Sequence, residues 1–192
     1  MRRYGAEVMW LPFDLHPEYP PHGVPRKTLE GRYGRGFLDH VATVVEEAGF
    51  RHAPPPTAPR SLRALELGEL ARDQGRHEDV HRRLFAAYWS EGRDIGDLDV
   101  LTSVATEAGL DAEATRAALE SDQVVDRVRQ ASEAAQKVGV DAVPAWLFDK
   151  QLLVLGAQPH EVLDNVMAKL GHAPVDSETS RVDSETSSTG SP

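Results

Sequence analysis

Residues 139–159 read GVDAVPAWLFDKQLLVLGAQP and carry the clearest structural signal in the chain. Gly139 follows a helical pattern and suits the left-handed position that closes a helix. Two short apolar runs, Ala145–Phe148 and Leu152–Leu155, are separated by three polar residues, which is typical of two antiparallel strands joined by a tight turn. Pro144 directly precedes the first run, where a residue without an N–H suits a strand start or a special turn. The stretch therefore predicts a β-hairpin introduced by a proline.

A further strand is expected near the N-terminus. The run Ala6–Leu11 is apolar at successive positions and ends at Pro12, as in a strand that is buried on both faces. The residues that follow, as far as Gly36, are rich in Pro, Gly, His and Arg. Such a composition predicts irregular structure.

Between this strand and the hairpin, apolar residues recur at helical spacing. Ser61 and Asp111 are expected N-caps, because their side chains can accept hydrogen bonds from free backbone amides. A final amphipathic helix is expected from Pro159 to Gly171. The other expected helices are Phe37–Ala48, Leu62–Ala71, Asp79–Trp89, Leu98–Ala108, Ala112–Leu119 and Val124–Val138.

The composition excludes several classes of function. The net charge of −10 gives no basic footprint for nucleic acid or an anionic membrane surface. No apolar stretch is long enough to cross a bilayer, and the first residues do not resemble a signal peptide, so we expect no membrane contact and a cytoplasmic location. The chain has no cysteine, which excludes a disulfide, a zinc-thiolate site and a thiol nucleophile within these 192 residues.

Length and composition predict one domain followed by a tail. A chain of 192 residues with 40% hydrophobic content can build one substantial core. The motif VDSETS occurs twice near the C-terminus, at Val175–Ser180 and Val182–Ser187, without apolar periodicity. We therefore expect a folded domain over residues 1–171 and a disordered tail over residues 172–192.

Taken together, these motifs resemble the DsbA-like thioredoxin-fold oxidoreductases, in particular their FrnE-like branch. The resemblance covers most of residues 6–170. The segments that carry it are Trp10–Pro17, Gly139-Val140, Val143-Pro144, Trp146–Asp149 and Gly156–Pro159. Two positions depart from the family pattern, because Ala142 stands where Gly is common and Lys150 replaces the Gly of the usual hairpin turn.

The resemblance implies an α/β, thioredoxin-like fold of the DsbA type with a large helical insertion over about residues 37–138. It also implies that the domain is incomplete and N-terminally truncated, because the family begins with a strand and a Cys-x-x-Cys helix that have no counterpart here. That strand lies centrally in the family's sheet, so its absence leaves unpaired backbone groups. Direct pairing of Ala6–Leu11 with the hairpin, a strand from another chain, or a natural start before Met1 would each resolve this.

The resemblance assigns a substrate-binding role to two residues. Pro144 matches the family's cis-proline, although an ordinary trans proline at a strand start is the alternative. Val143 would pair its backbone with an extended substrate segment, as in strand addition. No catalytic residue, metal ligand or cofactor is expected. The implied partner is a thiol- or disulfide-containing protein or a small thiol.

The expected function is that of a thiol-disulfide oxidoreductase by descent that is inactive in dithiol exchange, so whether the chain is an enzyme stays open. One alternative is a relative of 2-hydroxychromene-2-carboxylate isomerase or the kappa-class glutathione transferases, which share the fold and the helical insertion. A second alternative is a non-catalytic peptide-binding module, which as a homo-oligomer would bury its exposed sheet edge.

Three weaker signals have ordinary structural explanations. Residues 77–81 read HEDVH and match the zinc-protease pattern H-E-x-x-H, but a third ligand at a recognisable spacing is missing and a solvated helix start explains them better. His16 and Gln158 are polar residues at family-like loop positions, and satisfying a turn is the simpler interpretation of both.

Overall fold

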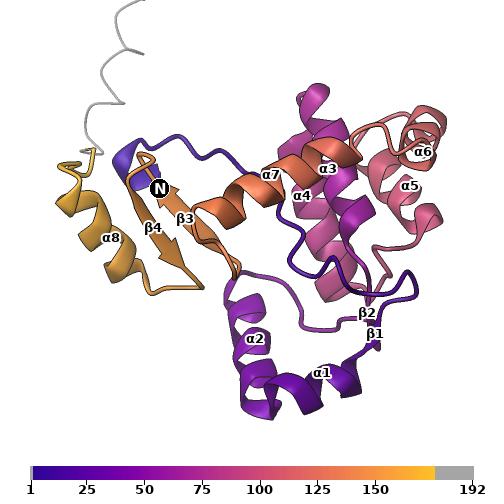
Figure 1. Cartoon of the computed structure of the whole chain (residues 1–192), viewed down its shortest axis with the longest axis horizontal. Helices are drawn as coiled ribbons and strands as arrows, with labels where there is room; N and C mark the ends of the chain where they lie inside the picture. The colour runs from indigo at the N-terminus through magenta and orange to yellow at the C-terminus, as the bar shows by residue number, and fades with distance from the viewer. Residues whose placement is uncertain (1, 176–192) are drawn as a thin grey trace, which may run out of the picture. The chain divides into compact units, whose positions relative to one another are not determined.

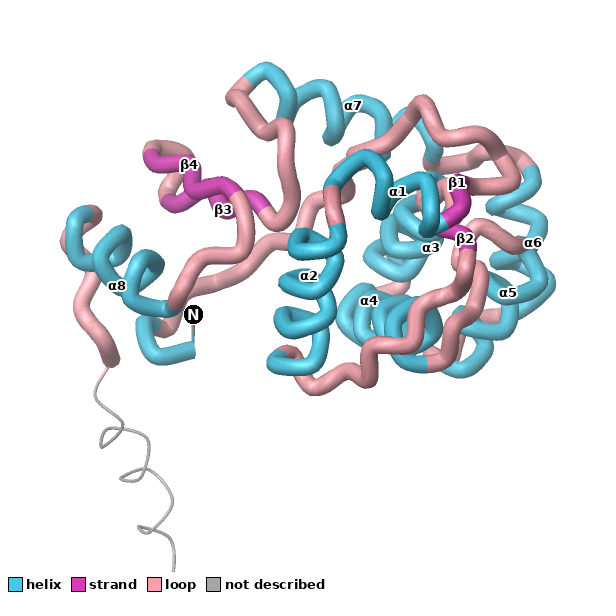
Figure 2. Tube along the Cα trace, turned by 90° about the horizontal axis from the view of Figure 1, so that it is seen from below, coloured by secondary structure: helices cyan, strands magenta, loops and turns pink. Residues whose placement is uncertain are grey.

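The computed structural model describes residues 2–175, most of which lie in helices (Figure 2). The chain divides into two compact units. The hairpin unit comprises residues 2–10 together with 142–175, and the helical unit comprises residues 11–141. No helix in the described part of the chain is long and apolar enough to cross a lipid bilayer.

The hairpin unit is built on the two strands that the sequence predicts. β3 (Ala145–Phe148) and β4 (Leu152–Leu155) pair antiparallel, with Ala145 opposite Leu155 and Phe148 opposite Leu152. The short helix η1 (Arg2–Tyr4) and the helix α8 (His160–Lys169) complete the unit. Figure 1 shows α8 running alongside the hairpin. The hairpin prediction is thus confirmed with its boundaries.

One face of the hairpin forms the core of this unit. Phe148 is buried against Val166 and Met167 of α8, because alternate residues of a strand point to the same face. The partly buried residues around them are Tyr4, Ala6, Trp146, Leu152, Val154, Leu163 and Leu170. The amphipathic pattern of α8 in the sequence therefore indicates this packing.

The prediction of a strand over Ala6–Leu11 is wrong, because the structure has neither helix nor strand there. Val8, Met9 and Leu11 are exposed instead of buried. A strand requires a ladder partner. Among residues 2–175 there are two sheets, and each consists of two strands, β1 with β2 and β3 with β4. Neither sheet pairs with residues 6–11.

The helical unit contains most of the chain. A two-residue pairing joins β1 (Val24–Pro25) to β2 (Thr57–Ala58). The helices are α1 (Arg26–Tyr33), α2 (Arg35–Glu47), α3 (Leu62–Asp73), α4 (His77–Phe85), the π-helical turn η2 (Ala86–Ser90), α5 (Leu98–Glu107), α6 (Ala112–Glu120) and α7 (Val125–Lys137).

The core of this unit lies around α3, which packs against α4, α5, α6 and α7. Figure 1 shows these helices gathered around one another. Each helix contributes apolar side chains from one stripe of its surface. The largest of those that are fully buried are Leu67, Val80, Leu101, Val104, Leu119 and Val128. The helical periodicity of the sequence predicts that these segments are helices.

Two short segments differ from the predictions. Arg26–Tyr33 forms α1 inside the region expected to be irregular, because Pro25 sets the entry into a run of Arg, Lys, Leu and Glu that favours a helix. Thr57 and Ala58 form β2 inside a proline-rich segment where the sequence predicts no strand. Both signals are too short to stand out against the surrounding prolines and glycines.

The predicted helix caps are confirmed in part. The Asp111 side chain accepts a hydrogen bond from the amide of Ala114 at 2.7 Å. Ser61 occupies the N-cap of α3, but its side chain makes no capping hydrogen bond. The proline expected at the first position of the last helix, Pro159, is its N-cap instead. From residue 176 onward, the predicted tail lies outside the described residues.

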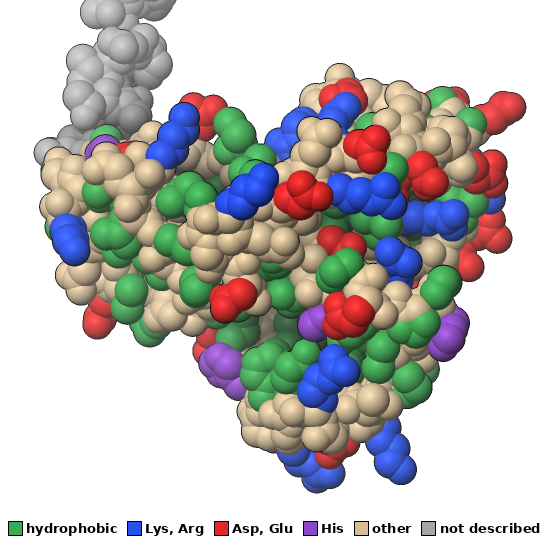
Figure 3. Space-filling view, in the orientation of Figure 1, with side chains coloured by type: hydrophobic (Ala, Val, Ile, Leu, Met, Phe, Trp, Pro, Cys, Tyr) green, Lys and Arg blue, Asp and Glu red, His purple; other side chains and the backbone are tan. Residues whose placement is uncertain are grey.

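Charged side chains of both signs are interspersed on the drawn face of the helical unit (Figure 3). Several form ion pairs between elements that are distant in the sequence. Arg127 of α7 contacts Asp73 of α3 at 2.8 Å, and Arg93 contacts Glu107 of α5 at 3.0 Å. The mixture of signs agrees with the absence of a basic footprint in the sequence.

Candidate substrate-binding site

The chain enters the candidate site from the end of α7. Val138 is the C-cap of that helix, and Gly139 follows with a φ of 93°, a left-handed conformation that a residue without a Cβ adopts easily. Val140 is buried. The peptide bond between Val143 and Pro144 is cis.

Pro144 is tied to the hairpin by one backbone hydrogen bond. The N–H of Gly156 donates to the Pro144 carbonyl oxygen at 2.7 Å, one step beyond the Ala145–Leu155 pair. The β3–β4 ladder therefore extends back to the proline. This contact fixes the position of the chain immediately after Val143.

Val143 itself is open to solvent. Its surface is 47% exposed, and within residues 2–175 neither its N–H nor its carbonyl oxygen has a hydrogen-bond partner. The sequence could identify the residue only through family resemblance. An exposed residue with two free backbone groups next to a strand can accept an extended chain by strand addition.

Exposed apolar side chains occur in the same unit, and the sequence pattern did not reveal them as surface residues. Val8, Met9 and Leu147 are exposed. The indole rings of Trp10 and Trp146 lie with their centroids 6.0 Å apart, tilted by 56°. The tryptophan pair brings the N-terminal segment beside β3.

The two polar loop residues singled out from the sequence have local roles. The Gln158 side-chain amide donates to the Leu155 carbonyl oxygen at 2.9 Å, which closes the turn after β4. His16 lies 3.1 Å from the Glu18 carboxylate and stacks on the ring of Tyr19. These contacts support the interpretation that both residues satisfy turns.

The H-E-x-x-H segment lies at the start of α4. The rings of His77 and His81 stack with their centroids 5.6 Å apart, and burial lowers the pKa of each imidazole. No group of three or more His, Cys, Asp or Glu residues in the described part of the chain is arranged to hold a metal ion. The segment therefore supports no metal site.

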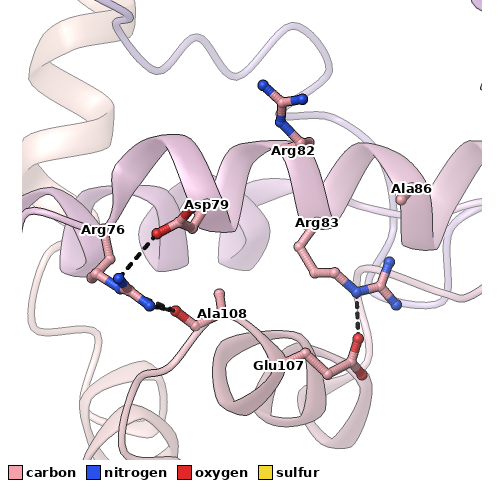
Figure 4. A pocket seen from close by; sticks show the side chains of 7 residues that line it. All are labelled: Arg76, Asp79, Arg82, Arg83, Ala86, Glu107 and Ala108. Carbon is pink, nitrogen blue, oxygen red and sulfur yellow. Dashed lines mark hydrogen bonds and ion pairs between the residues drawn. The ribbon is translucent and has the colours of Figure 1, made fainter. Parts of the chain in front are cut away.

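A shallow pocket lies between α4 and the end of α5 (Figure 4). Its charged groups bind one another. Arg76 donates to the Ala108 carbonyl oxygen at 2.8 Å and contacts Asp79 at 3.3 Å, while Arg83 pairs with Glu107. Because Arg76 and Arg83 are engaged in these contacts and Arg82 contacts Glu78 at 3.4 Å, we assign the pocket's residues to helix packing.

Comparison with known families identifies the chain over most of its length. The model of the DSBA-like thioredoxin domain matches residues 1–168. Among curated proteins, the uncharacterized protein YwbO of Bacillus subtilis (strain 168) is 28% identical over 166 residues, which cover 85% of this chain and 82% of that protein.

Two solved structures are similar to the chain as a whole. The probable DsbA oxidoreductase of Streptomyces coelicolor is 27% identical with a TM-score of 0.77, and the match covers 90% of this chain and 79% of that one. A 2-hydroxychromene-2-carboxylate isomerase is 21% identical with a TM-score of 0.65, covering 88% of this chain and 83% of the isomerase. At this identity the second likeness shows the fold alone.

Proposed function

Because the chain belongs to the DsbA-like thioredoxin domain family, we propose that it forms the substrate-binding part of a thiol-disulfide oxidoreductase of that family. In this proposal it holds an extended segment of a thiol- or disulfide-containing protein against Val143 and Pro144. The motifs around these residues support the further proposal that it belongs to the FrnE-like branch. Its cytoplasmic location and the identity of its partner stay predictions.

One observation carries the proposal, namely the free backbone of Val143. A peptide that runs antiparallel to this residue gains hydrogen bonds to both its N–H and its carbonyl oxygen. Pro144 cannot compete for such a peptide through an N–H, and its carbonyl oxygen is engaged by Gly156. Binding is thereby directed to Val143.

Dithiol exchange is not available to these 192 residues. Dithiol exchange requires a thiolate that attacks a disulfide sulfur, and the chain has no cysteine. An insulin-reduction assay on the chain is therefore expected to give the uncatalysed rate. Turnover above that rate would contradict the assignment of a binding role without exchange.

Peptide binding is tested by titrating the chain with an extended, cysteine-containing apolar peptide while following tryptophan fluorescence. Val143→Asp places a charge on the site and is expected to weaken binding at least about tenfold, since each tenfold change corresponds to about 1.4 kcal/mol. Val138→Asp is the matched control, because Val138 is 55% exposed but caps α7. Equal affinities of the two variants would contradict the proposal.

The peptide itself supplies a second control. Replacing its central residue by proline removes one N–H and should weaken binding if backbone pairing holds the peptide. The amide resonance of Val143 should shift on binding the original peptide in a ¹H–¹⁵N spectrum. Saturable binding of glutathione without peptide binding would instead favour the isomerase and glutathione-transferase alternative.

A further inference from the structure

Glu66 is a buried acid in the centre of the helical unit. It lies on α3 with 1% of its surface exposed, and within residues 2–175 its Oε2 atom has no hydrogen-bond partner. Burying an ionised carboxylate without partners is strongly unfavourable. The position therefore favours the protonated, neutral side chain.

Glu69, one turn further along α3, shows the opposite arrangement. It is also buried, but its carboxylate contacts Arg72 at 3.1 Å and Arg127 of α7 at 3.6 Å. Arg127 additionally contacts Asp73 at 2.8 Å. Ion pairs thus hold one end of the contact between α3 and α7. Glu66 lies one turn away on α3 and, among the described residues, forms no ion pair.

The charged groups that face Glu66 come from its own helix and from the α6–α7 region. The pKa of Glu66 is raised to about 7, mainly by burial and in smaller part by the charge of Asp122 between α6 and α7. Arg63 of α3 and Arg129 of α7 oppose this shift. In the described part of the chain, neither arginine forms an ion pair with Glu66, so the attraction does not compensate for burial.

We propose that Glu66 is a proton-sensitive element of the helical unit: it is neutral in the folded chain, and loss of its proton loosens the packing of α7 and the α6–α7 turn against α3. An ionised Glu66 is repelled by Asp122 and requires water. α3 packs against four other helices. Water can therefore reach Glu66 only if α7 and the α6–α7 turn move away from α3. No role of this kind follows from substrate binding at Val143.

The direction of the pH effect follows from linkage. The folded chain binds the Glu66 proton more tightly than the unfolded chain, whose glutamate has the ordinary pKa of 4.5. The contribution of Glu66 to stability is therefore complete below about pH 4.5 and falls as the pH rises toward 7. The buried imidazoles of His77 and His81 act in the opposite direction, since their lowered pKa values favour the folded chain at higher pH.

The test compares the full chain with Glu66→Gln, which keeps the shape of the side chain and cannot ionise. Urea unfolding at pH 5 and pH 8 gives an unfolding equilibrium constant for each protein. Relative to Glu66→Gln, the constant of the unsubstituted chain should rise on the order of 50-fold between these pH values. The difference between the two proteins removes the contribution of the histidines.

Glu69→Gln is the matched control on the same helix. It should destabilise the chain at both pH values, because it removes an ionised partner of Arg127. The pH dependence of its stability should stay the same as that of the unsubstituted chain. Hydrogen exchange should accelerate between pH 6 and pH 8, beyond the intrinsic effect of pH, in α7 and the α6–α7 turn of the unsubstituted chain and not in Glu66→Gln.

Carboxyl ¹³C titration of the unsubstituted chain reads Glu66 directly and does not depend on how any variant folds. Titration of Glu66 near neutral pH is the expected result. Titration below about pH 5, which lies close to the ordinary range of glutamate, would overturn the proposal. So would a pH dependence that Glu66→Gln retains, or accelerated exchange that is confined to helices other than α7.

Discussion

Asp149 and Lys150 are consecutive residues that both hold positive φ angles, 48° and 59°, and together they form the tight turn between β3 and β4. Such a turn matches the twist of the two strands, but it is unfavourable for residues that carry a Cβ. The hairpin therefore contains local strain at the position where the family pattern has glycine.

Lys150→Gly is expected to stabilise the hairpin unit by about 0.5–1 kcal/mol, because the relief of the left-handed strain exceeds the entropy that glycine loses on folding. Asp149 keeps its contact with His172 at 2.6 Å in this variant. Lys169→Gly, at the end of α8 where φ is negative, should destabilise by up to about 1 kcal/mol. Urea unfolding measures both, and a loss of stability in Lys150→Gly would contradict the strain argument.

Phe148→Ala should destabilise the hairpin unit by about 3–5 kcal/mol, since it leaves a cavity against Val166 and Met167 of α8. The adjacent Leu147 points to the other face and is 50% exposed, so Leu147→Ala should lose less than about 1 kcal/mol. Chemical unfolding followed by tryptophan fluorescence compares the two. Similar losses would mean that α8 does not cover the Phe148 face in solution.

Gly23→Ala should destabilise the helical unit by about 2 kcal/mol or more. Gly23 has a φ of 77°, and a Cβ there would collide with the Ala58 carbonyl oxygen on β2. Gly31 is the control, because it lies inside α1 with nothing within 4 Å of an added Cβ, and Gly31→Ala should stabilise by up to about 1 kcal/mol. Thermal unfolding of both variants measures the two effects. The prediction is contradicted if Gly23→Ala is as stable as the original chain.

Glu107 should make the helical unit sensitive to acid. Burial alone would raise the pKa of Glu107, but hydrogen bonds from Ser103, Arg83 and Arg93 lower it to about 2. Its stabilising contribution is thus present above about pH 4.5 and is lost as the pH falls toward 2. Because the carboxylate is more than a third exposed, water screens the interaction to about 1 kcal/mol.

The acid sensitivity is checked by unfolding the original chain and Glu107→Gln at pH 3 and pH 6. The two proteins should differ more in stability at pH 6 than at pH 3. Glu78→Gln is a suitable control, since Glu78 is highly exposed and contacts Arg82 at 3.4 Å. A difference between the Glu107→Gln and original chains that is independent of pH would contradict the assigned pKa.

The amino-acid sequence determines the local elements of this protein because their signals lie within a few residues of one another. The boundaries of β3 and β4 follow from two apolar runs and the residues between them, and the cap at Asp111 follows from one side chain next to a helical pattern. The same stretch identifies Val143 and Pro144 as the candidate site through family resemblance. Local pattern also predicts that α3 is a helix.

Only the tertiary structure decided which of these residues find partners. The run Ala6–Leu11 has the composition of a strand but forms none, because pairing depends on backbone groups far away in the sequence. The free N–H and carbonyl oxygen of Val143 are visible for the same reason only once the hairpin is in place. Glu66 and Glu69 are both acids on one helix, and what distinguishes them is whether an arginine of α7 reaches each carboxylate. The sequence sets what each residue can do, whereas packing determines the water and charge around it.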